Sequence, residues 1–99
     1  MDEALVESVV DFGGRPYLSY GLLFNTEKCG DFDMELIEEF FRAFTYNAKI
    51  NLHLVMRAGG NSHHVSEAAF KSCARALKDA LTIESDRLMS TKGILAAAI

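Results

Sequence analysis

A change of hydrophobic period between residues 50 and 62 constrains the fold of this chain more than any other feature. In a strand, side chains alternate between two faces, so residues 50–57 are predicted to form a strand with one apolar face. Ile50, Leu52, Leu54 and Met56 lie on the apolar side, and Asn51, His53, Val55 and Arg57 on the other. Ala58-Gly59-Gly60-Asn61 then turns the chain, and Ser62 can cap a helix that runs to about Leu81.

The predicted helix 62–81 has two distinct sides at about 100° per residue. Its apolar side carries Val65, Ala69, Cys73, Ala76 and Ala80 and should face the sheet. Its polar side carries His63, His64, Glu67, Lys71, Arg75 and Lys78. The histidines therefore lie away from the expected core.

The first half of the chain is predicted to begin with two strands, over residues 4–12 and 17–24. The segment between them, Gly13-Gly14-Arg15-Pro16, has the composition of a tight turn, so a hairpin is expected. In the second strand one face is apolar, with Leu18, Tyr20, Leu22 and Phe24 at alternate positions.

A first helix is predicted over about 34–48, with Asp33 as its N-cap. Acidic residues gather near its positive end, where the helix dipole favours them. Its buried face should comprise Ile37, Phe40, Phe41, Phe44 and Ala48. The element order ββαβα predicts an α+β two-layer sandwich with both helices on one face of the sheet. The other face, which carries His53, is expected to be solvated or covered by a partner.

Composition limits the class of protein. With 99 residues, 49% of them hydrophobic and 10% aromatic, the chain predicts a single small globular domain over residues 1–99. No apolar run approaches the roughly 20 residues of a membrane span, and the acidic Met1-Asp2-Glu3 does not resemble a secretory signal. The net charge of −4 argues against non-specific binding to nucleic acid or to an anionic membrane.

The two cysteines, Cys29 and Cys73, are too few for a disulfide scaffold and form no ligand-like motif. Free thiols of this kind favour a reducing compartment, so the cytoplasm is the expected location.

The three histidines of the chain all lie between residues 53 and 64. Imidazole and carboxylate are common ligands of divalent metal ions. His63 and Glu67 are four positions apart on a helix and can converge on one ion, whereas His64 points about 100° away and suits a second ion. Three histidines and one glutamate fill about one set of four ligands, so a chain that served two ions would supply half of what they need.

The alternative interpretation is a solvated helix face. Glu67, Lys71 and Arg75 at i, i+4 spacing form an ordinary ladder of charged side chains, worth a few tenths of a kcal/mol per oppositely charged pair. A single surface histidine would favour this interpretation. Three histidines and a carboxylate, all away from the apolar faces, favour a metal site.

Several motifs of the chain resemble the C-terminal half of the imidazoleglycerol-phosphate dehydratase family. The most specific is the run from Gly60 to Lys71, GNSHHVSEAAFK, followed by Ala74-Arg75-Ala76-Leu77. The further matches are Met1-Asp2-Glu3-Ala4-Leu5, Gly14-Arg15-Pro16-Tyr17, Gly30-Asp31-Phe32-Asp33, Glu38-Glu39-Phe40-Phe41, Leu52-His53-Leu54 and Ser90-Thr91-Lys92-Gly93-Ile94-Leu95. This resemblance implies a hydro-lyase of histidine biosynthesis that converts imidazole glycerol phosphate into imidazole acetol phosphate.

The resemblance also implies a duplicated fold and a site with two Mn²⁺ ions. Each half of the family fold brings one strand histidine and one HHxxE helix. By motif, His53, His63, His64 and Glu67 would be the manganese ligands of this chain. Arg15, Lys71, Ser90, Thr91 and Lys92 would hold the substrate, chiefly its phosphate. No residue is assigned as the general base, because Glu67 is expected to be a ligand.

The chain differs from the family in lacking the N-terminal half, with its own HHxxE helix. The expected partner is therefore that missing half or a second copy of the chain, which would complete the site. A catalytically silent metal-binding or assembly domain is the alternative. A nucleic-acid module is disfavoured by the acidic balance and by the absence of strands with interleaved aromatic and basic residues.

Overall fold

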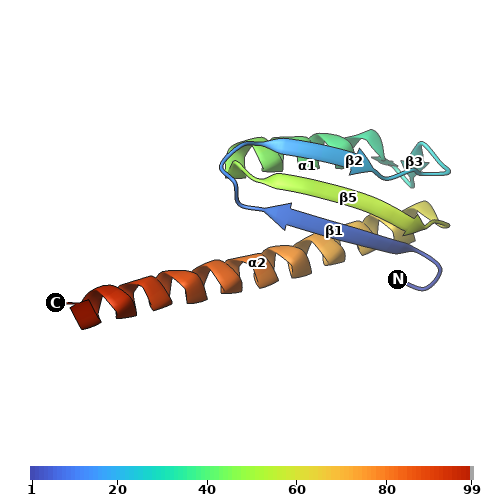
Figure 1. The fold of residues 1–99 in the computed structure, drawn as a ribbon. Coiled ribbons are helices and arrows are strands. Elements are labelled where there is room, and N and C mark those ends of the chain that lie inside the picture. Colours follow the sequence, from blue (N-terminus) through green and yellow to red (C-terminus); the bar gives the residue numbers. More distant parts are fainter. Residues whose placement is uncertain (99) are drawn as a thin grey trace.

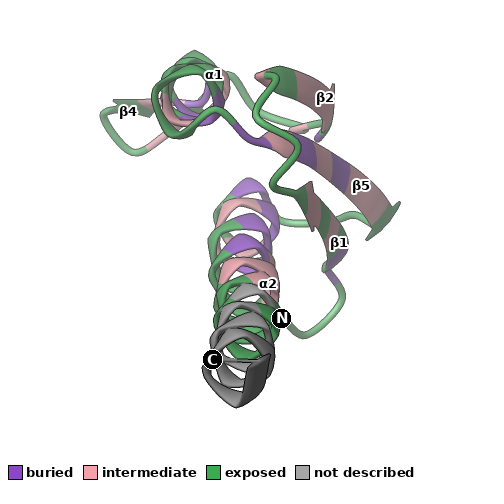
Figure 2. Ribbon diagram, turned by 60° about the vertical axis from the view of Figure 1, so that its left-hand side comes forward, coloured by how far each residue is buried: buried purple, intermediate pink, exposed green. Residues whose placement is uncertain are grey.

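The computed structural model describes the backbone of residues 1–98 and the side chains of residues 1–83 and 85–87. The elements follow in the order β1 (Leu5–Asp11), β2 (Tyr17–Gly21), β3 (Lys28–Cys29), β4 (Phe32–Asp33), α1 (Glu35–Ala48), β5 (Asn51–Ala58) and α2 (Ser62–Ala98). The three longer strands form one layer (Figure 1), and both helices lie on the same side of it (Figure 2). The predicted α+β sandwich is thus confirmed.

The expected β1–β2 hairpin is wrong, because β5 lies between the two strands in the order β1-β5-β2. β1 is antiparallel to β5 and β2 is parallel to it, and both Asp11 and Tyr17 lie opposite Asn51. The glycine-rich loop therefore crosses the start of β5, where the Asn51 side-chain amide donates to the Arg15 carbonyl at 3.2 Å. β5 is the central strand of the sheet, and its Leu52 is fully buried. A central strand buries more apolar surface than an edge strand does, which suits the apolar sequence of β5.

A second, two-stranded ribbon was missed from the sequence. β2 ends at Gly21, three residues before the predicted end of the strand, and β3 and β4 then pair with each other across a turn at Gly30. Gly30 has φ of 64°, in the left-handed region that favours glycine. The ribbon lies beside the start of α2, where the candidate site is found.

α1 begins one residue later than predicted and ends at the predicted residue, Ala48. The N-cap position is Met34 rather than Asp33, although the Asp33 carboxylate still accepts a hydrogen bond from the Glu35 N–H at 3.0 Å. Lys49, which follows the last helical residue, adopts a left-handed conformation with φ of 55° and ψ of 48°. A left-handed residue commonly ends a helix, and here a lysine takes the place usually held by glycine.

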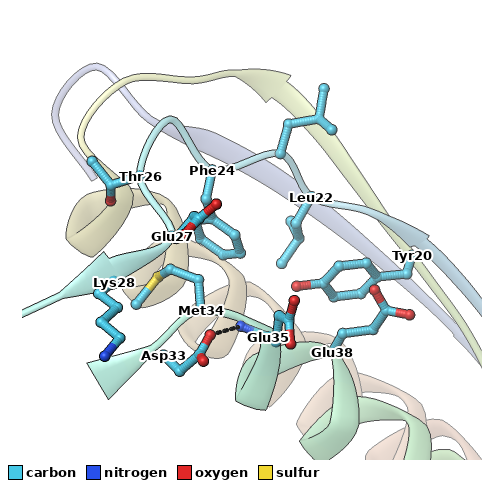
Figure 3. A pocket seen from close by; sticks show the side chains of 11 residues that line it. Tyr20, Leu22, Phe24, Thr26, Glu27, Lys28, Asp33, Met34, Glu35 and Glu38 are labelled. Atoms are coloured by element: carbon cyan, nitrogen blue, oxygen red, sulfur yellow. Dashed lines mark hydrogen bonds between the residues drawn. The ribbon is translucent and has the colours of Figure 1, made fainter. Parts of the chain in front are cut away.

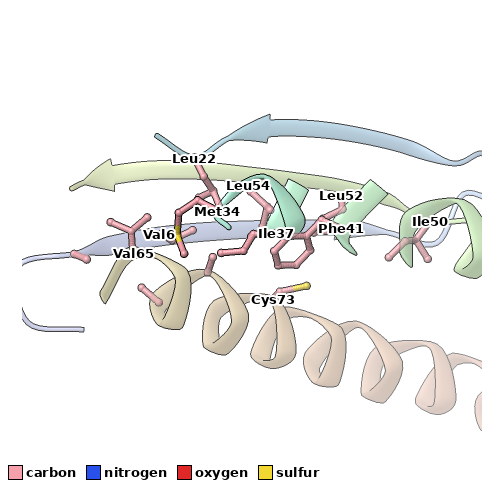
Figure 4. Close-up of a cluster of buried hydrophobic side chains, with 13 residues drawn as sticks. Val6, Leu22, Met34, Ile37, Phe41, Ile50, Leu52, Leu54, Val65 and Cys73 are labelled. Carbon is pink, nitrogen blue, oxygen red and sulfur yellow. The ribbon is translucent and has the colours of Figure 1, made fainter. Parts of the chain in front are cut away.

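The core lies between the sheet and the two helices (Figure 4). On α1, Ile37 and Phe41 are buried as predicted, but Phe40 is 51% exposed and Ala48 is also exposed. Thr45 is buried instead, and its hydroxyl donates to the Arg42 carbonyl at 2.9 Å. The buried apolar residues are Ala4, Val6, Leu22, Met34, Ile37, Phe41, Ile50, Leu52, Leu54, Val65, Ala68, Ala69 and Cys73.

α2 buries its first three turns and then leaves the sheet (Figure 1). Val65, Ala69 and Cys73 are buried as predicted, whereas Ala76 and Ala80 are only half-buried. The helix continues to Ala98 instead of ending near Leu81. Among the described residues, neither helix combines the length and the apolarity that a membrane crossing requires.

The Tyr20 hydroxyl lies at a cavity of about 350 Å³ between β2, the segment that follows it and α1 (Figure 3). Within the described part of the chain, this buried oxygen has no hydrogen-bond partner. Burial, with a smaller effect from the Glu38 carboxylate, raises the pKa of Tyr20 to about 12. The phenol therefore stays neutral in the folded protein at a pH where an unfolded chain would lose its proton.

Tyr20→Phe is expected to raise the free energy of unfolding by about 1 kcal/mol near neutral pH, because it removes a buried, unpaired hydroxyl. As pH rises above the ordinary tyrosine value of 10, the unfolded wild type ionises before the folded protein does, so stability falls toward about pH 12. The variant should lack this part of the loss. Urea unfolding at pH 7, 9 and 11 measures both effects, with Tyr46→Phe at an exposed position as the control. Identical pH profiles for wild type and Tyr20→Phe would contradict the assignment.

Candidate metal centre

The first turn of α2 carries the two adjacent histidines. Asn61, not Ser62, caps the helix, because its side-chain oxygen accepts from the backbone N–H groups of His63 at 2.9 Å and His64 at 3.3 Å. Ser62 is buried instead and donates its hydroxyl to Asn25 at 2.8 Å. These bonds hold the start of the helix against the segment that leads into β3.

His64 faces the N-terminal segment. Its Nδ1 lies 2.5 Å from Oε1 of Glu3, and this hydrogen bond is the main reason why the pKa of His64 is raised. The same bond lowers the pKa of Glu3. A carboxylate that accepts from Nδ1–H leaves Nε2 as the free nitrogen of the neutral ring, which is how histidine ligands are commonly oriented toward a metal.

Gly60 makes room for the Glu3–His64 pair. A Cβ atom at position 60 would lie 2.4 Å from Cγ of Glu3, a separation that side chains do not tolerate. The φ of 155° at Gly60 also lies in a region that other residues rarely adopt. Gly60 is thus required for the close approach of the N-terminal segment to α2.

His63 faces the other way, toward β3 and β4. Its Nε2 lies 3.6 Å from Oε2 of Glu67, and the opposite carboxylate oxygen lies 3.0 Å from Nζ of Lys71. Lys71 is the largest cause of the lowered pKa of Glu67, so this carboxylate is ionised at neutral pH. The i, i+4 pairings predicted from the sequence for His63, Glu67 and Lys71 are therefore present.

The donors fit divalent ions in kind and in spacing. Two ligands at about 2.1 Å from one ion lie roughly 3–4 Å apart, a range that includes the 3.6 Å between His63 and Glu67. The rings of His63 and His64 are 6.3 Å apart between centroids and face different neighbours, which suits two separate ions. Carboxylate suits hard ions such as Mn²⁺, and imidazole suits many divalent transition metals, so this mixed set of donors is compatible with Mn²⁺.

His53 does not join the helix histidines. It is the third residue of β5, on the face opposite the buried Leu52 and Leu54, and its ring contacts Tyr17 at 5.6 Å between centroids. Five residues separate it from the end of β5, or about 16 Å of strand. The chain therefore places its predicted ligands on two different surfaces.

The predicted substrate-binding residues are also spread over the molecule. Arg15 is exposed in the loop between β1 and β2, and Lys71 is exposed on α2. Ser90, Thr91 and Lys92 fall in the helical backbone of α2, and their side chains lie outside the described residues.

Sequence reasoning missed three residues beside the histidines: Asp2, Glu3 and Cys29. Asp2, Glu3 and His64 each offer one ligand atom within 4.8 Å of the others, the one such group among the described residues. Sγ of Cys29 lies 3.9 Å from Nδ1 of His63. Glu3 is 61 positions from His64 along the chain, so no local spacing could have paired them.

Glu3→Gln is expected to lower the pKa of His64 toward its ordinary value, because the amide keeps the shape of the side chain but removes its charge. NMR titration of the histidine ring signals in metal-free protein measures this directly. Glu7→Gln is the matched control, since Glu7 pairs with Arg57 at 2.6 Å instead of with a histidine. An unchanged His64 titration in Glu3→Gln would refute the pairing.

Comparison with known proteins agrees with the sequence motifs. A family model described as imidazoleglycerol-phosphate dehydratase matches residues 1–77. The enzyme of that name from Gluconobacter oxydans (strain 621H) is 51% identical over 98 residues, which are 96% of this chain and 50% of the relative. The one from Staphylococcus saprophyticus is 52% identical over 96 residues, with the same coverage. The chain spans about half the length of the curated relatives it matches.

Solved structures give the same result. The crystal structure of imidazoleglycerol-phosphate dehydratase from Staphylococcus aureus subsp. aureus N315 matches with a TM-score of 0.76 and 53% identity, covering 78% of this chain and 45% of that one. The Pyrococcus furiosus structure in complex with (S)-C348 matches with a TM-score of 0.71 and 35% identity, covering 78% of this chain and 43% of that one. The resemblance drawn from the motifs is confirmed, and the chain belongs to the imidazoleglycerol-phosphate dehydratase family.

Proposed function

We propose that this chain supplies half of a dinuclear manganese site that dehydrates imidazole glycerol phosphate to imidazole acetol phosphate. The observation that carries the proposal is the division of the ligands between two surfaces. His63, His64 and Glu67 lie on α2, while His53 lies on the uncovered face of the sheet. Neither group fills the coordination sphere of an ion by itself, so a second copy of the chain or another half of the family fold has to complete it.

Each residue then has a distinct task. His63 and Glu67 would hold one ion, and His64, oriented by Glu3, would hold part of the other. Bound manganese would stabilise negative charge on the substrate imidazole, as metal ions do for bound water. Lys71 keeps Glu67 ionised and, with Arg15, offers positive charge to a phosphate. Ser90, Thr91 and Lys92 remain proposed phosphate-binding residues on the strength of the motif.

The uncovered face of the sheet supports self-association. Leu5, Val9 and Tyr17 are each more than half exposed, and the last of these contacts His53. An apolar patch that carries a candidate ligand is a typical interaction surface. The proposed compartment is the cytoplasm, which suits a chain with two free cysteines.

The proposal predicts that Mn²⁺ drives assembly of the chain. Sedimentation velocity should show a small species in chelator-treated buffer and a larger species after Mn²⁺ is added, with reversal by chelator. The ions would link ligands from different copies, which makes the association metal-dependent. A monomer under both conditions would rule out self-completion of the site.

A catalytically silent half-domain is the second candidate, and it is favoured by the separation of His53 from the helix histidines, which leaves an incomplete ligand set on each surface. Assay of the assembled, manganese-loaded protein with imidazole glycerol phosphate separates the two. Steady formation of imidazole acetol phosphate supports the dehydratase. Metal-dependent assembly without turnover supports the silent domain.

A further inference from the structure

Cys29 is the one sulfur group that contacts a candidate metal ligand among the described residues. It ends β3, and its Sγ lies 3.9 Å from Nδ1 of His63. The chain leading into β3 is held to the start of α2, because the Thr26 hydroxyl donates to Ser62 at 3.0 Å. The Met34 N–H also donates to the Glu27 carbonyl at 2.9 Å, which fixes the other side of the ribbon. These two hydrogen bonds, one on each side of the ribbon, thus hold the thiol beside His63.

The thiol and the imidazole line a cavity of about 560 Å³ at the start of α2. The thioether of Met34 and the carboxylate of Glu67 also line the cavity, and its other walls are mainly apolar. Its lining residues are Cys29, Phe32, Met34, Ile37, His63, Ser66, Glu67 and Phe70. A thiol, a thioether and an imidazole in one cavity are the donor types that soft and borderline ions select, whereas Mn²⁺ favours oxygen and imidazole.

The spacing of sulfur and nitrogen suits one such ion. A tetrahedral Zn²⁺ with Zn–S of about 2.3 Å and Zn–N of about 2.0–2.1 Å places the two donors roughly 3.6 Å apart. The observed 3.9 Å needs only a slightly wider angle at the ion. Cys29 and His63 can therefore bind one thiophilic ion with little movement.

The two nitrogens of His63 have different partners. Nδ1 faces the Cys29 thiol, and Nε2 faces the Glu67 carboxylate at 3.6 Å. A neutral imidazole has one nitrogen that can bind a metal and one that carries a proton. Binding at Nδ1 with sulfur and binding at Nε2 with carboxylate are therefore mutually exclusive for a neutral ring.

We infer that Cys29 determines the metal selectivity of this centre, by giving thiophilic divalent ions a binding mode at Nδ1 of His63 that competes with manganese. The Sγ–metal bond forms as the thiol proton leaves to solvent, so no oxidant or reductant is needed. The competition rests on the proposed manganese site, whereas the binding of a thiophilic ion by Cys29 and His63 does not.

Cadmium is the probe, because a cadmium–thiolate bond gives a charge-transfer absorption in the ultraviolet. Titration of the metal-free wild type with Cd²⁺ at fixed pH should produce this absorption. It should be lost in Cys29→Ser, and in Cys29→Val should the serine variant fold poorly. It should persist in Cys73→Ala, in which Cys29 is the sole thiol. His63→Gln should weaken Cd²⁺ binding by at least about tenfold.

Absorption that persists in both Cys29 variants, or that never forms in the wild type, overturns the inference. A second titration adds Mn²⁺ to the cadmium-loaded protein. Loss of the absorption as Mn²⁺ binds, with Mn²⁺ affinity unchanged in Cys29→Ser, supports competition for His63. Simultaneous binding of both ions overturns the competition. A wild type that shows the cadmium absorption but binds no manganese refutes the proposed function and leaves the cysteine site standing.

Discussion

Phe41→Ala is expected to lower the free energy of unfolding by about 3–5 kcal/mol, the range found when a buried phenylalanine is truncated. Phe41 is 1% exposed and stacks on Phe70 of α2 at 4.9 Å between ring centroids. Its loss leaves a cavity where α1, α2 and the sheet meet, and domains of this size have only about 5–15 kcal/mol in total. Urea unfolding followed by circular dichroism measures the change.

The neighbouring Phe40 is the matched control. It also contacts Phe70, at 5.3 Å, but it is 51% exposed. Phe40→Ala should therefore cost about 1 kcal/mol, since most of its ring area is not removed from water. Equal losses in the two variants would show that the core is not where the structure places it.

His64→Ala is expected to weaken Mn²⁺ binding by more than about 100-fold, beyond the usual effect of losing an outer hydrogen-bond partner of a ligand. Metal-driven assembly should be lost with it, because the same bonds would join the copies. Mn²⁺ titration monitored by electron paramagnetic resonance and sedimentation with Mn²⁺ measure the two effects.

Lys78→Ala serves as the control for His64→Ala, since Lys78 is exposed on the same helix, 11 residues beyond Glu67. It should bind Mn²⁺ and assemble like the wild type. Normal manganese content in folded His64→Ala would contradict the assignment of this histidine as a ligand. Loss of binding in Lys78→Ala would instead indicate a general effect of altering the helix.

The hydrophobic period predicted which segments form helices and strands better than it predicted which strands pair with each other. The alternation over residues 50–57 correctly identified β5, and the helical period identified Val65, Ala69 and Cys73 as the buried side of α2. The glycine-rich loop wrongly predicts a hairpin, because local composition shows where a chain turns but not which strands then pair with each other. Pairing depends on the total apolar burial of the sheet, which favours β5 at its centre.

Helical spacing also failed to separate neighbours on α1. Phe40 and Phe41 both fall on a broad apolar stripe and both contact Phe70, so only the packing of α1 against the rest of the core decides which ring is covered. Thr45 was missed because its hydroxyl bonds within the helix, which allows a polar residue to be buried.

Some contacts of the candidate site could likewise be predicted from the sequence, and others could not. His63, Glu67 and Lys71 lie within two turns of one helix, so their contacts follow from spacing alone. Glu3 and Cys29 reach the histidines from distant segments, and their contacts depend on the fold. The separation of His53 from the helix histidines likewise follows from the sheet and not from the number of residues between them.

The place of β5 between β1 and β2 has a consequence for biosynthesis. Both early strands take their sheet pairing from residues 51–58, so β1 and β2 have no strand of this sheet to pair with until β5 is synthesised. While a ribosome is still adding that segment, the nascent chain exposes two unpaired strands, a state prone to aggregation. Folding of this sheet thus begins only after β5 has been made.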